Sequence, residues 1–569
     1  MRILASVSLL FALGVLNGCG NPSPPTESAE SQSVIQTCAD LNAVMVPGLG
    51  DYGRDIHTNS DEAQAYFDQG LRLAFSYYFP ESVASFTAAA CFDPDNAMIE
   101  WGIAFANAPN PNSRYGAVPD DVTGNGWRAI QKAKQLADSA SNLSDADKGL
   151  INALYVMLDS DTHPDQIARS AAAINAAQML YQRFPQDLEV AFLTADAIMM
   201  ATPWQYYSQE DGAPLNMADK AQRILETGIA QAPNHPGLNH LYIHLMENSQ
   251  QPDLAEMSAD RLESLTPKAG HMVHMPGHIY MRLGRYADSI ATNQRSVEAD
   301  QYFASVWGDL SFPDVAYGLS HRGHRGHAEN FIHWGAVLAG NSELAFTTID
   351  AMVADMNQQR LQSGGGQRTL ANYWMTLRFF QRWDDILAIT LPENAPPYIE
   401  GMYHFVRGSA FAHNKQVDAA QRELAALHAV TQQEGLTEQR ASVNTVADLL
   451  GIAFHELTGD IARAEDKLQD AISFYQQAVS GQDNLRYMEP PDWLQSTRLA
   501  LGNAYLDSQK YADAEATFRK DLDLLHENGW VLYGLLQTLQ ASQQDEDIEA
   551  IEKRFGDAWQ YADVDLGSF

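Results

Sequence analysis

Residues 233–286 read PNHPGLNHLYIHLMENSQQPDLAEMSADRLESLTPKAGHMVHMPGHIYMRLGRY, and this stretch decides the fold. It holds two pairs of histidines, His240 with His244 and His274 with His278, and the members of each pair lie four residues apart. Each histidine of the second pair follows its counterpart in the first pair by 34 residues. Residues four apart share one face of an α-helix. The stretch therefore predicts two equivalent helices that present histidines in the same direction.

The 34-residue offset equals the length of the tetratricopeptide (TPR) repeat, a helix–turn–helix unit that stacks into a solenoid. Pro233 and Pro267 each end a repeat, and they too lie 34 residues apart. Small and large residues at TPR spacings recur near both ends of the chain, at Tyr66, Gly70, Phe86, Ala89 and Pro94, and at Leu501, Gly502, Tyr505, Ala514, Phe518 and Asp521. Helical periodicity dominates elsewhere, so the sequence predicts an all-α solenoid of TPR-like repeats.

Four parts are expected, because a chain of 569 residues is too long for one compact core. Residues 1–19 are expected to form a lipoprotein signal peptide, and residues 20–60 a disordered tether with an N-terminal arm. Residues 61–390 are expected to form an N-terminal TPR-like array with a histidine-rich groove. The Pro-rich run LPENAPP marks a boundary, and residues 391–569 are expected to form a C-terminal TPR array.

The N-terminus indicates export. An apolar run too short to span a bilayer leads into LNGC at residues 16–19, which resembles a lipobox. We expect lipidation at Cys19, with an ordinary secretory signal as the alternative. The protein would then be lipid-anchored in the periplasm or at the outer membrane, and would touch the membrane only through its N-terminal lipid. In such an oxidising compartment, Cys38 and Cys91 either form a disulfide bond or remain separate thiols.

The charge balance limits the partners of this protein. It contains 36 basic and 72 acidic residues, which give a net charge of −36. Such a negative field argues against a nucleic-acid partner and against an anionic lipid surface, and it attracts cations. Adaptation to a salty medium is the better explanation of the total charge.

The histidine pairs predict a transition-metal site. In a TPR hairpin the first helix lines the concave groove, and the register places six candidate groups there: His240, His244, Glu247, His271, His274 and His278. Neighbouring helices pack roughly 8–10 Å apart, so imidazoles from both can meet at one ion or at two. Nitrogen ligation favours zinc, copper or iron, and Glu247 would bridge two ions or act as a general base. The alternatives are histidines that only pack, or that hold a peptide carboxylate when protonated.

A second group of histidines follows in HRGHRGHAENFIHW, residues 321–334. The glycines between the first three histidines favour an irregular segment, with the next helix beginning near His327. On that register His327 is a further metal ligand, whereas His333 faces a neighbouring helix. His321 and His324 are expected to form a rim that guides cations inward.

Pro276 lies between His274 and His278, inside the expected helix. Proline is tolerated in the first turn of a helix but kinks its interior. The helix is therefore expected either to begin near His274 or to bend there.

Several stretches resemble a bacterial family of secreted TPR proteins: HPGLNHLYIHLMENS, GHMVHMPGHIYMRLGRY, AQAYFDQGLRLAFSYYF and ADAIMMATPWQYY, between residues 60 and 350. The resemblance implies the fold and the position of the site, without an activity. The family commonly has an Asn-His step in the first hairpin, where this chain has Tyr78-Phe79, so a ligand at that step would be missing. A carboxylate frequent in the family corresponds to Asp196.

Two functions of different classes follow from these patterns. The first is an envelope-anchored TPR lipoprotein with a histidine-rich transition-metal site, possessing hydrolytic or redox activity if the metal keeps an open position. The alternative is a non-catalytic TPR scaffold that binds peptides or partner proteins in its groove at the cell envelope. Trp204, Tyr206 and Tyr207 either line a substrate pocket or pack as an aromatic plug.

Overall fold

The computed structural model describes residues 42–568, apart from 114–122, 209, 312, 314 and 316–319. This part of the chain is helical, and its only β-structure is two isolated bridges. The helices are α2 (Asp61–Phe75), α3 (Phe79–Phe92), α4 (Ala97–Ala106), α5 (Asn125–Ser139), α6 (Asp145–Leu158), α7 (Gln166–Arg183), α8 (Leu188–Ala201), α9 (Ala218–Gln231), α10 (Pro236–Met246), α11 (Glu256–Leu265), α12 (Gly270–His274), α13 (Pro276–Arg282), α14 (Tyr286–Trp307), α15 (His321–Leu338), α16 (Ser342–Val353), α17 (Gln358–Leu361), α18 (Gly364–Phe379), α19 (Trp383–Ala388), α20 (Pro397–His413), α21 (Val417–Thr431), α22 (Val446–Ala464), α23 (Leu468–Asp483), α24 (Thr497–Asp507), α25 (Tyr511–Leu524), α26 (Gly529–Ser542) and α27 (Asp545–Ala558). Three short 3-10 helices lie at η1 (Pro111–Ser113), η2 (Pro252–Ala255) and η3 (Leu566–Ser568).

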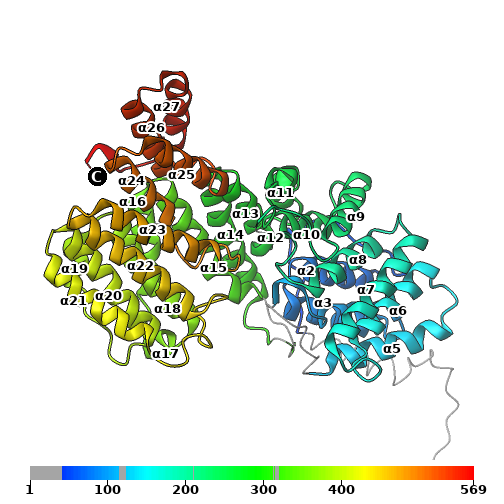
Figure 1. The fold of residues 1–569 in the computed structure, drawn as a ribbon. Helices are drawn as coiled ribbons and strands as arrows, with labels where there is room; N and C mark the ends of the chain where they lie inside the picture. The colour runs from blue at the N-terminus through cyan, green and yellow to red at the C-terminus, as the bar shows by residue number, and fades with distance from the viewer. Residues whose placement is uncertain are drawn as a thin grey trace, which may run out of the picture. The chain divides into compact units, whose positions relative to one another are not determined.

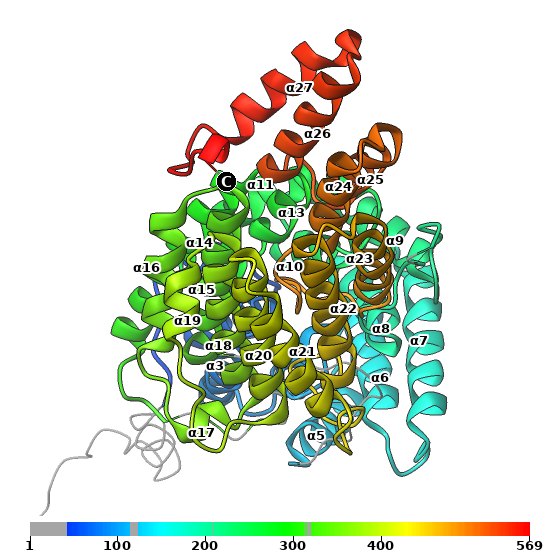
Figure 2. The ribbon, with the colours of Figure 1, turned by 60° about the vertical axis from the view of Figure 1, so that its left-hand side comes forward.

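Consecutive helices pack against each other as helix–turn–helix pairs (Figures 1 and 2). Examples are α2 with α3, α20 with α21, α22 with α23, and α24 with α25. Each pair also contacts the next helix along the chain, so that the pairs stack. The predicted all-α solenoid of TPR-like repeats is confirmed.

Glycine and phenylalanine interlock within the repeats, as the spacing predicts. A Cβ atom added at Gly70 on α2 would lie 2.7 Å from the ring of Phe86 on α3. A Cβ atom added at Gly502 on α24 would lie 2.4 Å from the ring of Phe518 on α25. Both phenylalanines are fully buried. The missing side chain is therefore what allows the two helices of a pair to approach closely.

Replacing Gly502 with alanine is expected to lower the free energy of unfolding by about 1–3 kcal/mol, because the methyl group overpacks against Phe518. Gly451, in the interior of α22, is the matched control, since a Cβ atom there would meet nothing within 4 Å. Gly451→Ala is expected to stabilise the protein by about 0.5–1 kcal/mol, because alanine costs less backbone entropy in a helix. Urea denaturation of both variants checks the prediction, and equal effects would contradict it.

Residues 42–569 form one compact unit. One cluster of buried apolar residues extends from Met281 on α13 to Leu494, after α23. The packed core therefore continues across the boundary expected at residues 391–397. The division into two arrays at residue 391 stays a prediction about repeat organisation.

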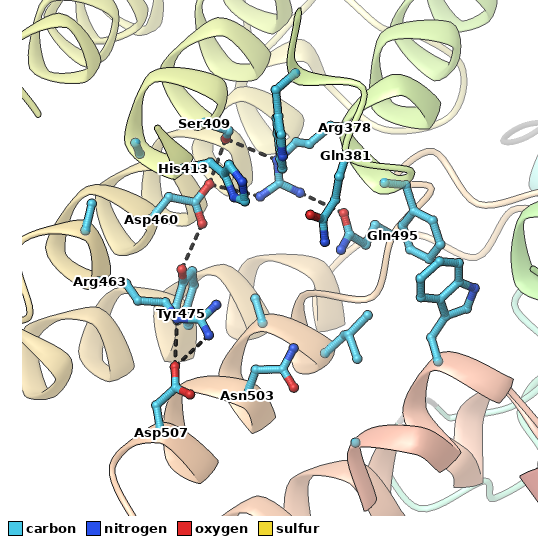
Figure 3. A pocket seen from close by; sticks show the side chains of 18 of the residues that line it. Arg378, Gln381, Ser409, His413, Asp460, Arg463, Tyr475, Gln495, Asn503 and Asp507 are labelled. Carbon is cyan, nitrogen blue, oxygen red and sulfur yellow. Dashed lines mark hydrogen bonds and ion pairs between the residues drawn. The ribbon is translucent and has the colours of Figure 1, made fainter. Parts of the chain in front are cut away.

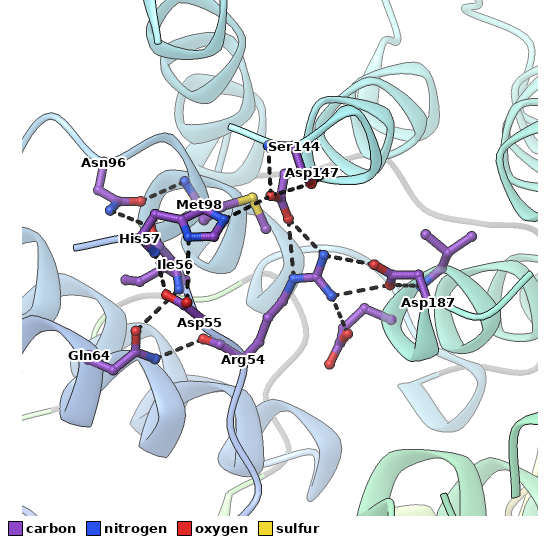
Figure 4. A network of polar contacts seen from close by, with 12 residues as sticks. Arg54, Asp55, Ile56, His57, Gln64, Asn96, Met98, Ser144, Asp147 and Asp187 are labelled. Carbon is purple, nitrogen blue, oxygen red and sulfur yellow. Dashed lines mark hydrogen bonds and ion pairs between the residues drawn. The ribbon is translucent and has the colours of Figure 1, made fainter. Parts of the chain in front are cut away.

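The N-terminal arm is held in place from residue 42 onward by a buried ionic network (Figure 4). Arg54 pairs through Nη2 with Asp147 at 2.7 Å and with Asp187 at 3.0 Å. The same guanidinium also contacts Glu189. The arm thus joins α2 to the N-terminal ends of α6 and α8.

Most of the expectations for the N-terminus concern residues outside the described part of the chain. These are the signal peptide at 1–19, the tether up to residue 41, Cys19 and Cys38. Cys91, in α3, is disulfide-bonded. In the described part of the chain, none of the helices has the length and hydropathy needed to cross a membrane.

Candidate metal centre

Seven histidines meet where α10, α12, α13 and α15 come together. We call them the histidine cluster: His240, His244, His271, His274, His278, His324 and His327. His327 is partly exposed, and the others are buried. The sequence placed these groups on an open groove. The structure instead encloses them, because α2, α14 and the loop before α24 pack around the same face.

The first turn of α10 is capped by a side chain and packs closely against neighbouring helices. His235 is its N-cap and accepts the backbone N–H of Leu238 at its Nδ1, while Pro236 occupies the first helical position. A Cβ atom at Gly237 would lie 2.8 Å from the ring of Phe75 and 2.9 Å from the ring of Phe192. This glycine lets α10 approach α2 and α8 closely and brings His240 to the end of α2.

The helical backbone is interrupted at Pro276. Helix α12 ends at His274, helix α13 begins at Pro276, and Met275 between them keeps right-handed helical dihedral angles. Proline lacks the N–H group that would continue the ladder. His274 and His278 therefore lie on two successive helices, and their Nε2 atoms are 2.9 Å apart.

Helix α15 begins at His321, so the irregular segment expected before His327 is wrong. A Cβ atom at Gly323 or Gly326 would meet nothing within 4 Å, so these glycines do not interrupt the helix. His321 is buried and donates from Nδ1 to Oε1 of Glu81 at 2.7 Å. His324 is buried within the cluster, so the expected exposed rim of His321 and His324 is not formed. His333 bonds Thr376 of α18 through Nε2 at 2.8 Å, as expected for a residue facing a neighbouring helix.

The Nδ1 atoms of the cluster are held by acceptors that fix the tautomer. His240 donates from Nδ1 to the carbonyl oxygen of Phe75 at 2.6 Å. His274 donates from Nδ1 to Oδ1 of Asn293 at 2.6 Å. The Asn293 amide donates in turn to the carbonyl of Ser289, which keeps its oxygen toward the imidazole. In both neutral histidines the lone pair is therefore on Nε2.

Two further histidines follow the same pattern. His244 donates from Nδ1 to Oε1 of Glu247 at 2.9 Å, and His324 donates from Nδ1 to Oδ2 of Asp300 at 3.2 Å. The Nε2 atoms of His244 and His324 are buried and have no hydrogen-bond partner among the described residues. Metal-bound histidines usually donate their second ring nitrogen to a carboxylate or a carbonyl in this way.

The ligand atoms of six histidines fall into two groups, each within 4.8 Å of one another. The first triad is His240, His244 and His271, and the second triad is His274, His278 and His327. In the first triad the Nε2 atoms of His240 and His271 are 3.1 Å apart. The structure therefore brings together all six histidines that the sequence selected.

Glu247, the C-cap of α10, contacts both triads. It accepts from His244 at Oε1 and pairs at Oε2 with Nδ1 of His278. Glu489 also lies 2.9 Å from Nδ1 of His278, so Glu247, His278 and Glu489 form a third potential ligand group. Burial alone would lower the pKa of His278, but the two carboxylates outweigh it and raise this pKa. Burial raises the pKa of Glu247.

Burial keeps most of the cluster neutral. It lowers the pKa of His240 to about 3, and it lowers the pKa values of His244, His271 and His274 well below the usual range. Neighbouring histidines add to this effect by charge repulsion. Neutral imidazole is the form that binds a metal ion.

No protein-family model matches the chain, and no curated protein matches it. Among solved structures, the human IFIT1 dimer with m7Gppp-AAAA is 10% identical, with a TM-score of 0.31 over 95% of this chain and 96% of that chain. A chain of the APC/C hetero-tetramer Cut9-Hcn1 is 11% identical, with a TM-score of 0.27 over 87% and 90%. Yeast Tom70 is 10% identical, with a TM-score of 0.28 over 87% and 93%.

Aromatic side chains pack against the first triad. The ring of Tyr77 lies 4.6 Å from that of His240, 5.4 Å from that of His271 and 5.7 Å from that of His244, centroid to centroid. Burial, with a contribution from Asp196, raises the pKa of Tyr77. Trp204 packs edge-on against His244 at 5.3 Å. Trp204, Tyr206 and Tyr207 are all buried, which favours the aromatic-plug interpretation.

Tyr78 supports the cluster from outside. Its hydroxyl donates to Asp300, the carboxylate that holds His324, and accepts the backbone N–H of His271 at 3.3 Å. Tyr78 therefore supplies a hydrogen-bonding hydroxyl at the Tyr78-Phe79 step, where the family that the chain resembles commonly has Asn-His.

A cavity of about 410 Å³ lies beside the loop that carries Glu489. Its lining includes Asn248, Arg282, Trp334, Tyr487 and Glu489. Tyr487 donates from its hydroxyl to the backbone carbonyl of Glu247 at 3.1 Å. The cavity therefore reaches Glu489, one of the two carboxylates that contact His278.

Proposed function

We propose that the histidine cluster binds transition-metal ions. One observation carries this proposal: Nδ1 atoms are held by acceptors, while the buried Nε2 atoms of His244 and His324 have no partner in the part of the chain that the structure describes. A buried polar atom without a partner costs about 1–3 kcal/mol, and a folded protein rarely keeps one without a reason. A bound cation would satisfy both nitrogens.

The donor set indicates which metals would bind. Neutral imidazoles suit zinc, copper and iron, whereas calcium and magnesium require oxygen ligands. With three histidines in a triad, a fourth position is left for water or a substrate. Glu247, which contacts Nδ1 of one histidine in each triad, would hold the protons on these atoms and so orient the imidazoles toward the ions. The cavity beside Glu489 would admit a small substrate, which supports hydrolytic or redox activity. Anchoring at the cell envelope through Cys19 is part of the proposal.

Metal analysis of the purified full-length protein tests this function. We expect stoichiometric zinc, copper or iron by mass spectrometry, and its loss in the double variant His240→Ala with His274→Ala, which removes one ligand from each triad. His333→Ala is the matched control, because His333 is a buried histidine that bonds Thr376 outside the cluster. The proposal would be contradicted if the double variant retained the metal, or if the wild-type protein contained none.

A second candidate function is the binding of a peptide or partner protein in a cavity of about 640 Å³ (Figure 3). Side chains from α18, α20, α22, α23, α24 and α26 line it. The buried Arg378 uses its donors on Ser409, Gln495 and Asp460. The side-chain amide of Asn503, which also lines this cavity, makes no hydrogen bond to another described residue, and such an amide can bond a peptide backbone. A chain that binds no metal would leave this cavity as the functional site.

A further inference from the structure

We infer that the histidine cluster is a dinuclear centre in which His324 supplies a further nitrogen ligand to one of the two ions. This inference rests on the proposed metal binding and extends it by a metal count and by a seventh ligand.

The ligand nitrogens of the six histidines form two groups of three rather than one group of six. Zinc binds imidazole nitrogen at about 2.0–2.1 Å, so two nitrogens on one ion lie at most about 4.2 Å apart. Each triad keeps its three ligand nitrogens within 4.8 Å of one another, and in the described part of the chain no such group contains histidines of both triads. Each triad already supplies three nitrogens, which is enough for one ion. Two ions therefore fit the ligands better than one.

His324 lies between the triads. Its ring centroid is 5.1 Å from that of His271 in the first triad and 4.9 Å from that of His274 in the second. Both contacts are edge-on, so the imidazoles do not simply stack. His324 is thus placed to complete the coordination of either ion.

The ring of His324 is oriented for coordination. Asp300 accepts from its Nδ1 at 3.2 Å and also accepts from the hydroxyl of Tyr78. This leaves a lone pair on the buried Nε2, and none of the described residues donates a hydrogen bond to it. The arrangement is the carboxylate–histidine–metal pattern seen at many metal sites.

Glu247 couples the two triads through one carboxylate. Its Oε1 holds His244 of the first triad, and its Oε2 contacts Nδ1 of His278 of the second triad. A change at either ion therefore reaches the other through the same side chain. Glu247 acts here as a positioning residue for both triads.

His321 provides a matched control on the same helix, one turn before His324. It donates from Nδ1 to Glu81, and its ring lies 5.0 Å from that of Phe303. It is as buried as His324, at 4% exposure for each. Its replacement removes a buried, carboxylate-bonded histidine without touching the triads.

The test is a zinc titration of the metal-free full-length protein against a chelator of known affinity. We expect two ions in the wild-type protein and in His321→Ala. In His324→Ala we expect one retained ion and a second bound at least about 100-fold more weakly, because changes in the outer shell alone cost about 10–100-fold. If His324→Ala loses helical content, His324→Gln takes its place, since glutamine keeps an amide donor for Asp300.

The outcomes separate the inference from the proposed function. No zinc bound by the wild-type protein would overturn both. One ion in the wild-type protein, or two ions of unchanged affinity in His324→Ala, would overturn the dinuclear assignment while leaving metal binding in place. A second readout is the electron paramagnetic resonance spectrum of the copper(II)-loaded protein. Two adjacent ions broaden or quench each other's signal in the wild-type protein, and His324→Ala is expected to give the spectrum of an isolated ion.

Discussion

Replacing Arg54 with methionine is expected to lower the free energy of unfolding by about 3–5 kcal/mol, the usual cost of removing one partner of a buried ion pair. Asp147 and Glu189, two of the carboxylates that this guanidinium pairs with, have side chains only 3% and 5% exposed. Asp187 completes the group at 17%. Without Arg54, three carboxylates stay close together with little access to water. Urea denaturation followed by circular dichroism measures the loss.

Arg285→Met is the control for Arg54→Met. Arg285 also pairs with three carboxylates, Glu256, Asp260 and Asp288, but their side chains are 42–53% exposed. Water screens these charges, so the change is expected to cost at most about 1 kcal/mol. Similar losses in the two variants would show that burial does not govern the Arg54 network.

Loading the metal-free protein with zinc is expected to stabilise it by about 4 kcal/mol when free zinc is a thousandfold above the dissociation constant. The ligands come from four helices, α10, α12, α13 and α15, and meet only in the folded chain. The unfolded chain offers no such preformed site, so the ion favours the folded state. Thermal unfolding at graded zinc concentrations measures the effect as a rise in the midpoint.

The double variant His240→Ala with His274→Ala is expected to lose this stabilisation, while its helical content is unchanged. His333→Ala is expected to keep it, because His333 lies outside the cluster. A rise of the same size in all three proteins would mean that zinc stabilises the chain at another place, and would count against the histidine cluster.

Repeat length and helical periodicity carry most of the information about this fold. The 34-residue offset and the pairing of Gly502 with Phe518 are local patterns, and local patterns are what sequence reasoning detects. The same patterns selected the six histidines of the two triads, because residues four apart on a helix share a face.

Three features of the centre could not be predicted in this way. His324 was assigned to a rim because glycines flank it, yet these glycines face open space on a continuous helix. Glu489 lies 211 residues beyond His278, and no spacing rule connects them. Asn293 and Asp300, both on α14, accept hydrogen bonds from His274 and His324, and no sequence pattern singles out either residue. Contacts between distant segments depend on tertiary packing, which periodicity does not report.

The burial of the histidine cluster is the other feature that the sequence does not predict. The register shows which helix face carries the histidines, but not which segments cover that face. Tyr77, in the turn between α2 and α3, and Trp204, after α8, both pack on the first triad. These segments cover the helix face that carries the histidines, so the histidines are buried rather than exposed in a groove. This burial accounts for the neutral imidazoles.

The loop that carries Tyr487 and Glu489 has a consequence for biosynthesis. The ribosome makes these residues long after the histidines of α10 to α15, and only then can Glu489 reach His278 and Tyr487 reach the backbone of Glu247. A nascent chain or a truncated fragment that ends before this loop carries every histidine but lacks one of the two carboxylates beside His278. The pair of carboxylates beside His278 can therefore be complete only after the chain has been made beyond Glu489.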